Sequence, residues 1–210
     1  MILKDKVVLV TGSGAGIGEA IAVAMAEAGA QVVSADIDGA AAQKTADAAA
    51  AFQAKTLALE TDVGNVAEID AMVDRTVDEF GRLDIIVNNA GVTRRAYIMD
   101  LTEEDWDRIH RVNAKGVFFC LQRAARTMIA QGEGRIINIA SIAGRGYAGT
   151  SNAAYAASKG AVIALTKTAS QQLGPHNINV NAICPGVTRT PLSDRNLAVR
   201  AEEQGVSLKE

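Results

Sequence analysis

The chain has 210 residues, of which 49% are hydrophobic and 21% charged, a composition typical of a globular domain and not of a disordered chain. Its net charge is −3 and no basic run occurs, which argues against a surface for nucleic acid or an anionic membrane. Two cysteines and two histidines without ligand spacing exclude a disulfide framework or a metal site, and a charged start with no membrane-length apolar run predicts a cytoplasmic protein.

Short apolar runs alternate along the chain with longer helix-forming stretches. In chain order we expect a strand at 6–11, a helix at 17–28, a strand at 31–36, a helix at 40–52, a strand at 55–60, a helix at 66–80, a strand at 84–88, a long helix at 103–130, a strand at 135–140, a helix at 153–174 and a strand at 177–183. Asn65, Gly81 and Thr102 stand where helix caps are expected. Apolar strands separated by helices predict an α/β fold, with one parallel sheet covered on both faces. Because no linker or repeat divides the chain, residues 1–210 are expected to form a single domain.

A glycine-rich segment at residues 11–18, Thr-Gly-Ser-Gly-Ala-Gly-Ile-Gly, joins the first expected strand to the first helix. Side chains at these positions would keep a pyrophosphate away from the backbone amides and the helix N-terminus. Gly18 lets the helix pack closely on the strand. Glycine-rich runs are often only flexible loops, but one placed between a strand and a helix at the start of a βαβ unit favours dinucleotide binding.

Asp36 ends the second expected strand, about 20 residues after the glycines. A carboxylate there bonds the ribose hydroxyls of the adenosine half and repels the 2′-phosphate of NADP. Since Ala15 supplies no positive charge for that phosphate, and Asp36 is followed by Ile37 and Asp38, we predict NAD as the cofactor, with NADP less favoured. The alternative, which does not exclude the first role, is that Asp36 caps the loop into the next helix.

Tyr155 and Lys159 lie four residues apart in the expected helix 153–174, so both side chains share one helix face. A lysine charge at about 4 Å stabilises a phenolate and would lower the pKa of Tyr155 from near 10 to about 7. Such a tyrosine exchanges protons at physiological pH. The same spacing is common on solvated helix faces, so the pair acquires meaning only from the rest of the sequence.

These features and three further motifs make the chain resemble the classical short-chain dehydrogenase/reductase (SDR) family. The further motifs are Asn88-Asn89-Ala90-Gly91 after the fourth strand, Ser141 after the fifth and Pro185-Gly186 after the sixth. Each motif is moderately specific, whereas all of them in order, in the loops after successive strands, are very specific. The resemblance runs from about residue 4 to 192 and implies a Rossmann-type doubly wound sheet and an NAD-dependent oxidoreductase acting on the CH–OH group of its donors.

The resemblance assigns cofactor contacts to matching positions in several loops. Asp62 and Val63 would hold the adenine, and Val187 and Thr190 the nicotinamide carboxamide. The full set of expected cofactor-binding residues is Gly12, Gly16, Ile17, Gly18, Asp36, Asp62, Val63, Asn89, Ala90, Gly91, Tyr155, Lys159, Val187 and Thr190. Without the resemblance, the segments 62–63, 88–91 and 185–186 would be interpreted as ordinary turns.

Four catalytic residues are also implied: Asn113, Ser141, Tyr155 and Lys159. Ser141 would hydrogen-bond the substrate oxygen, and Tyr155 would remove the alcohol proton as hydride leaves, or donate it in reduction. Lys159 would bind the nicotinamide ribose and lower the pKa of Tyr155, and Asn113 would help hold a proton-relay water. Taken alone, a mid-helix asparagine is usually solvent-facing, and a serine before a glycine-rich stretch is usually a loop residue.

The chain departs from the SDR pattern at its C-terminal end. Residues 191–210 match only the start of a substrate-covering segment, and the family's last helix and final edge strand are expected to be absent from this sequence. Because an exposed sheet edge is unfavourable, we favour a longer complete protein over a short natural variant. The helices at 103–130 and 153–174 could form a homodimer, whereas the homotetramer of the family also uses the final strand.

Three functions remain open. The first is hydride transfer between NAD(H) and a secondary alcohol or ketone held by Ser141 and Tyr155. The second is an NADPH-linked 3-oxoacyl reductase, against which Asp36 argues, and the third is a non-catalytic NAD-binding scaffold, against which the four catalytic residues argue. The loops at 93–99, at 142–154 and after Pro191 do not identify the substrate. Their arginines, at 94, 95 and 145, could meet an acidic group but are more typical of a solvated surface.

Overall fold

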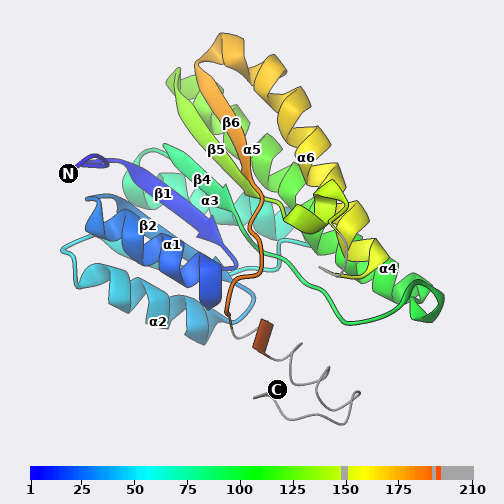
Figure 1. Ribbon diagram of the computed structural model, residues 1–210. Helices are drawn as coiled ribbons and strands as arrows, with labels where there is room; N and C mark the ends of the chain where they lie inside the picture. The colour runs from blue at the N-terminus through cyan, green and yellow to red at the C-terminus, as the bar shows by residue number, and fades with distance from the viewer. Residues whose placement is uncertain (148–150, 191–192, 195–210) are drawn as a thin grey trace.

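The computed structural model describes residues 1–147, 151–190 and 193–194, and its centre is one sheet of six parallel strands (Figure 1). The strands are β1 (Val7–Thr11), β2 (Gln31–Asp36), β3 (Thr56–Glu60), β4 (Ile85–Asn88), β5 (Gly134–Ile139) and β6 (Ile178–Ile183), in the order β3-β2-β1-β4-β5-β6. The sheet therefore grows outward in one direction from β1 to β3 and in the other from β4 to β6, which is the doubly wound arrangement. The predicted fold class is confirmed.

Helices cross over between successive strands. They are α1 (Gly16–Glu27), α2 (Gly39–Ala50), α3 (Val66–Phe80), α4 (Glu103–His110), α5 (Val117–Gln131) and α6 (Ala153–Leu173). Short 3-10 turns form η1 (Ile98–Asp100), η3 (Ile142–Arg145) and η4 (Gly174–His176), and a π turn, η2 (Arg111–Gly116), separates α4 from α5. Apart from that π turn, each predicted strand and helix is present with its ends within two residues of the expected positions.

The two faces of the sheet are covered by different helices because successive strand residues point to opposite sides. Leu9 of β1 belongs to a buried cluster that includes residues of α3, α5 and α6, whereas its neighbours Val8 and Val10 pack with alanines of α1 and α2. Figure 1 shows α1 and α2 together on one side of the sheet. Helices on both faces are what the apolar strands predicted.

Capping residues at α3 and at the start of α4 lie where the sequence predicted them. The side chain of Asn65 accepts a hydrogen bond from the Ala67 amide at the start of α3, and Gly81 ends that helix in the left-handed conformation with φ at 75°. Thr102 and Asp105 form a reciprocal capping box at the start of α4.

The expectation of one continuous helix over 103–130 is wrong in its middle, where the π turn Arg111–Gly116 intervenes. A π turn accommodates one more residue than an α-helical turn and so changes which side chains face inward. A Cβ on Gly116 would lie 2.7 Å from the Val63 carbonyl oxygen, so this close approach requires glycine. No local signal in the sequence marks the turn, because the contact that accompanies it comes from the loop after β3.

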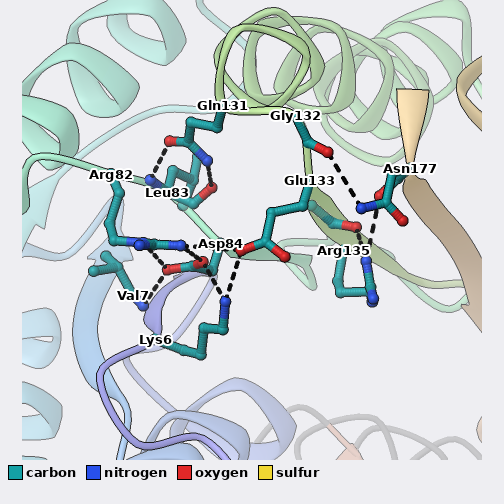
Figure 2. A network of polar contacts seen from close by, with 11 residues as sticks. Lys6, Val7, Arg82, Leu83, Asp84, Gln131, Gly132, Glu133, Arg135 and Asn177 are labelled. Atoms are coloured by element: carbon teal, nitrogen blue, oxygen red, sulfur yellow. Dashed lines mark hydrogen bonds and ion pairs between the residues drawn. The ribbon is translucent and has the colours of Figure 1, made fainter.

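A network of charged side chains ties the amino ends of the strands together (Figure 2). The buried carboxylate of Asp84 accepts hydrogen bonds from the Val7 amide at 2.9 Å, from Lys6 at 3.0 Å and from Arg82 at 2.7 Å. Lys6 and Arg82 also pair with Glu133, immediately before β5. Burial raises the pKa of Asp84, but the bonds from Arg82, the Val7 amide and Lys6 outweigh burial and lower that pKa below its ordinary value.

The segment 191–210, predicted to begin a substrate cover, lies outside the described residues except for 193–194, as do residues 148–150 of the loop 142–154. Among the described helices, none has both the length and the apolar character needed to span a membrane.

Candidate active site

The predicted site residues gather at the carboxyl ends of the strands, where β1 and β4 lie side by side and the sheet reverses its direction of growth. Thr11 ends β1, and its hydroxyl oxygen accepts hydrogen bonds from the amides of Asn89 at 3.1 Å and Ala90 at 3.2 Å. The side chain of Asn89 donates to the carbonyl oxygen of Gly12 at 2.8 Å. The turn after β4 and the glycine loop after β1 are therefore held against each other.

The glycine loop is packed too closely for side chains. A Cβ on Gly12, whose φ is +63°, would lie 2.6 Å from Ala90 Cα, and a Cβ on Gly18 would lie 2.1 Å from the Gly12 carbonyl oxygen. The residue before α1, Ala15, provides no side-chain cap, so the amides of Gly16 and Ile17 at the start of the helix are open to an anion. A loop of this kind fits the pyrophosphate of a dinucleotide.

Asp36 ends β2 beside the glycine loop. Its carboxylate accepts hydrogen bonds from the amide of Gly14 at 2.8 Å and from the amide of Asp38 at 3.0 Å. The alternative role of Asp36, capping the loop into the next helix, is present in the bond from the Asp38 amide, while Asp38 itself caps α2 and accepts from the Ala41 amide. Asp36 therefore connects the glycine loop to the loop that leads into α2.

Asp62 and Val63 form a turn after β3. The carboxylate of Asp62 accepts from the Gly64 amide at 2.8 Å and from the guanidinium of Arg111 at 2.7 Å, while Val63 is 7% exposed. Burial raises the pKa of Asp62, but the bonds from Arg111 and the Gly64 amide outweigh it and lower that pKa below its ordinary value. Arg111 was not predicted, since it is 49 residues away in sequence.

Asn113 lies in the π turn and is completely buried, so the alternative of an ordinary solvent-facing asparagine is excluded. Its side-chain oxygen accepts a hydrogen bond from the Val92 amide at 2.8 Å. Its side-chain nitrogen donates to the Val92 carbonyl at 2.9 Å and to the Ser158 hydroxyl at 3.2 Å. The side chain of Asn113 therefore joins the loop after β4 to α6.

Tyr155 and Lys159 share the first turns of α6, as their spacing predicted. Lys159 is 3% exposed, and its ammonium donates to the Ile139 carbonyl at 2.6 Å and lies 5.8 Å from the centre of the Tyr155 ring. A Cβ on Gly91 would lie 3.5 Å from this ammonium and 3.4 Å from the side-chain oxygen of Asn113. Three predicted parts of the site, the turn after β4, the π turn and α6, thus meet at Gly91.

The pKa values of Tyr155 and Lys159 differ from those expected from the sequence. Burial lowers the pKa of Lys159 to about 8. Burial also raises the pKa of Tyr155, against the opposing effect of a hydrogen bond with Ser141. The predicted fall of the Tyr155 pKa is therefore not found in this structure, because the spacing of two residues on a helix contains no information on how deeply each is buried.

Ser141 follows β5 and caps η3, where its hydroxyl accepts from the Ala143 amide at 3.1 Å. The turn η3 packs directly on α6, since a Cβ on Gly144 would lie 2.6 Å from the backbone of Lys159. Val187 and Thr190 are not brought into these contacts. Val187 is 92% exposed, and Thr190 forms a local turn with Ser193 through three hydrogen bonds.

Asn152 borders the site and was not predicted from the sequence. It is 5% exposed and caps α6 by accepting from the Tyr155 amide at 2.8 Å. Its side-chain nitrogen donates to the Arg94 carbonyl at 2.5 Å and to the Thr93 hydroxyl at 3.3 Å. An asparagine just before a helix is a recognisable cap signal, but its bonds to the loop after β4 depend on tertiary contacts.

Comparison with known proteins agrees with this geometry. A family model described as short chain dehydrogenase matches residues 6–200. The chain is 41% identical to the (2S)-[(R)-hydroxy(phenyl)methyl]succinyl-CoA dehydrogenase subunit BbsD of Thauera aromatica, over 92% of this chain and 77% of that protein. It is 38% identical to a 3-oxoacyl-[acyl-carrier-protein] reductase of Thermotoga maritima, over 99% and 83%. Among solved structures, an NAD+-bound xylitol dehydrogenase superposes with a TM-score of 0.91 at 36% identity, over 96% and 78%.

Proposed function

Because this chain belongs to the short-chain dehydrogenase family of oxidoreductases, which act on CH–OH or keto groups, we propose that it transfers hydride between NAD(H) and a secondary alcohol or ketone. The observation that carries the proposal is the meeting of Lys159 and Asn113 at Gly91, beside a glycine loop that leads into an uncapped helix N-terminus. A dinucleotide along that loop would bring its reactive end to these two side chains.

The chain supplies positions and protons, while bound NAD supplies the hydride acceptor. Tyr155 removes the proton of the alcohol in oxidation and donates it in reduction, and Ser141 holds the same oxygen. Lys159 binds the ribose next to the nicotinamide. Asn113 fixes the loop after β4 to α6 through its bonds to Val92 and Ser158, and it helps to hold a proton-relay water. Val187 and Thr190 would contact the carboxamide, which requires a change of their present contacts.

The preference for NAD over NADP rests on Asp36. Its carboxylate stands at the rim of the glycine loop, bonded to the Gly14 amide, where a 2′-phosphate would meet a like charge. Fluorescence titration with NADH and with NADPH tests this preference directly, and tighter binding of NADPH would contradict it.

A second candidate is an NADPH-linked 3-oxoacyl reductase, favoured by the similarity to the reductase of Thermotoga maritima. Two assays distinguish the candidates: a panel of polyols, hydroxysteroids, 3-hydroxyacyl thioesters and hydroxy acids with NAD, followed by NADH absorbance, and the reduction of 3-oxoacyl thioesters with NADPH. Turnover of 3-oxoacyl thioesters with NADPH alone would favour the second. NAD binding without turnover of any compound would favour a non-catalytic NAD-binding scaffold.

We also propose that residues 1–210 form a single nucleotide-binding domain that assembles as a homo-oligomer. Support comes from the half-exposed aromatic side chains of Trp106 in α4 and Phe118 in α5, which are 47% and 40% exposed. Light scattering of the purified protein tests the assembly, and a monomer at micromolar concentration would contradict it.

A further inference from the structure

Arg111 connects the turn after β3 to the π turn. Its guanidinium lies 2.7 Å from the Asp62 carboxylate, and the two side chains are 45% and 24% exposed. A Cβ on Gly64 would lie 2.3 Å from a guanidinium nitrogen, so the absence of a side chain at Gly64 lets Arg111 lie across the turn. The contact is thus an ion pair combined with close packing.

The turn after β3 touches the π turn at its other end as well. A Cβ on Gly116 would lie 2.7 Å from the carbonyl oxygen of Val63. Arg111 and Gly116 are the first and last residues of the π turn, so the segment 62–64 contacts both of its ends. A displacement of that segment would be transmitted to the π turn between the two contacts.

Asn113 lies between these contacts and has little freedom of its own. Both polar atoms of its side chain are bonded, to the Val92 backbone and to Ser158, which is the neighbour of Lys159. A continuous series of contacts therefore leads from the turn after β3, through the π turn, to the residues proposed for proton transfer.

We propose that Arg111 is a positioning residue that couples occupancy of the adenine end of the cofactor site to the geometry of Asn113. The inference rests on the proposed function, because it takes the turn at Asp62 and Val63 as the adenine site. Adenine packed against this turn restricts its motion, Arg111 passes the restriction to the π turn, and Asn113 is held in place. The adenine half of the cofactor thereby contributes to the order of a site that it does not touch.

The test uses ADP-ribose, which contains the adenine end and no nicotinamide, and follows amide hydrogen exchange in peptides covering 111–116. In the wild-type protein ADP-ribose should slow this exchange by about two- to fivefold, the range that a partly exposed ion pair supports. Arg111→Ala and Asp62→Asn should each remove the effect although ADP-ribose still binds, and Arg111→Lys should restore part of it. Lys115→Ala, an exposed change in the same π turn, should keep the full effect.

Kinetics provide the second readout. With saturating NAD, Arg111→Ala should lower kcat as well as raise the KM for NAD, whereas a residue that only contacts adenine would change KM alone. An ADP-ribose complex whose exchange at 111–116 is unchanged, or an Arg111→Ala variant with wild-type kcat, overturns the coupling but leaves the proposed function standing. Failure of the wild-type protein to bind ADP-ribose contradicts both.

Discussion

The ammonium nitrogen of Lys159 donates a 2.6 Å hydrogen bond to the carbonyl oxygen of Ile139, the last residue of β5. One buried cation thus fixes α6 to the edge of the sheet where the site lies. The same burial penalises the charge and lowers the pKa of Lys159 to about 8, so a residue of the proposed site also costs stability.

Lys159→Met should make the cofactor-free protein more stable at neutral pH and abolish turnover. The unfolded chain keeps its lysine charged up to a pH near the ordinary value of 10.5, while the folded chain releases that proton near 8. The unfolded state therefore binds more protons between these values, and wild-type stability rises with pH in that window, by about 3 kcal/mol at most. Urea unfolding of both proteins across this range is the measurement. A variant less stable than the wild type at every pH would contradict the prediction.

Tyr155→Phe should leave NADH binding nearly intact and lower turnover by roughly 10²–10⁴-fold, the usual contribution of a general acid or base. Appreciable activity of the variant would exclude the proton-transfer role. Because burial raises the Tyr155 pKa in the structure described, we further expect NAD⁺ to lower that pKa when it binds. Tyrosinate absorbance of the wild type minus the variant, titrated with and without NAD⁺, isolates this residue from Tyr97 and Tyr147.

Asp36→Ala should shift cofactor preference toward NADP by about tenfold, since it removes one like charge beside the 2′-phosphate position. The ratio of the NADH and NADPH dissociation constants is the quantity to compare. Asp47→Ala is the matched control, because it removes an exposed carboxylate of α2 that accepts from Gln43 and not from the glycine loop, and it should leave the ratio unchanged. An unchanged ratio in Asp36→Ala would remove the basis for predicting NAD.

Asp84→Asn should destabilise the protein by roughly 1–2 kcal/mol at neutral pH, because Lys6 and Arg82, which are 37% and 42% exposed, lose the carboxylate they share but keep Glu133. The pKa of Asp84 is lowered in the folded protein, so its contribution is present above the ordinary value of 3.8 and is lost as pH falls through the lower folded value. Urea unfolding near neutral pH and at a pH of about 3 should show the difference between wild type and variant shrinking in acid. Glu79→Gln, which removes the exposed partner of Lys55, should have little effect at either pH.

The parts of the fold and site that follow from local patterns could be predicted from the sequence. Apolar runs located the strands, and Asn65 and Gly81 fixed both ends of α3 because capping depends on only a few neighbouring residues. The glycine loop could be predicted equally well from the sequence, since its function depends on the absence of side chains at fixed positions between a strand and a helix.

The remaining features depend on contacts between distant segments. The π turn accompanies a contact between Gly116 and Val63, and Arg111 meets Asp62 across 49 residues, so neither leaves a local signal. The Tyr155 pKa was predicted in the wrong direction for the same reason: spacing along a helix indicates the neighbouring charge, whereas burial is decided by the whole fold.

The parallel sheet also separates a stabilising network from the proposed site by the length of a strand. The charged network around Asp84 lies at the amino ends of the strands and the proposed site at their carboxyl ends, and a five-residue strand such as β1 spans roughly 16 Å. Substitutions that far apart generally have additive free energies. The chain is therefore suited to protein engineering: changes that reinforce the amino edge should offset the destabilisation that accompanies redesigning the loops for a new substrate, without altering what those loops bind.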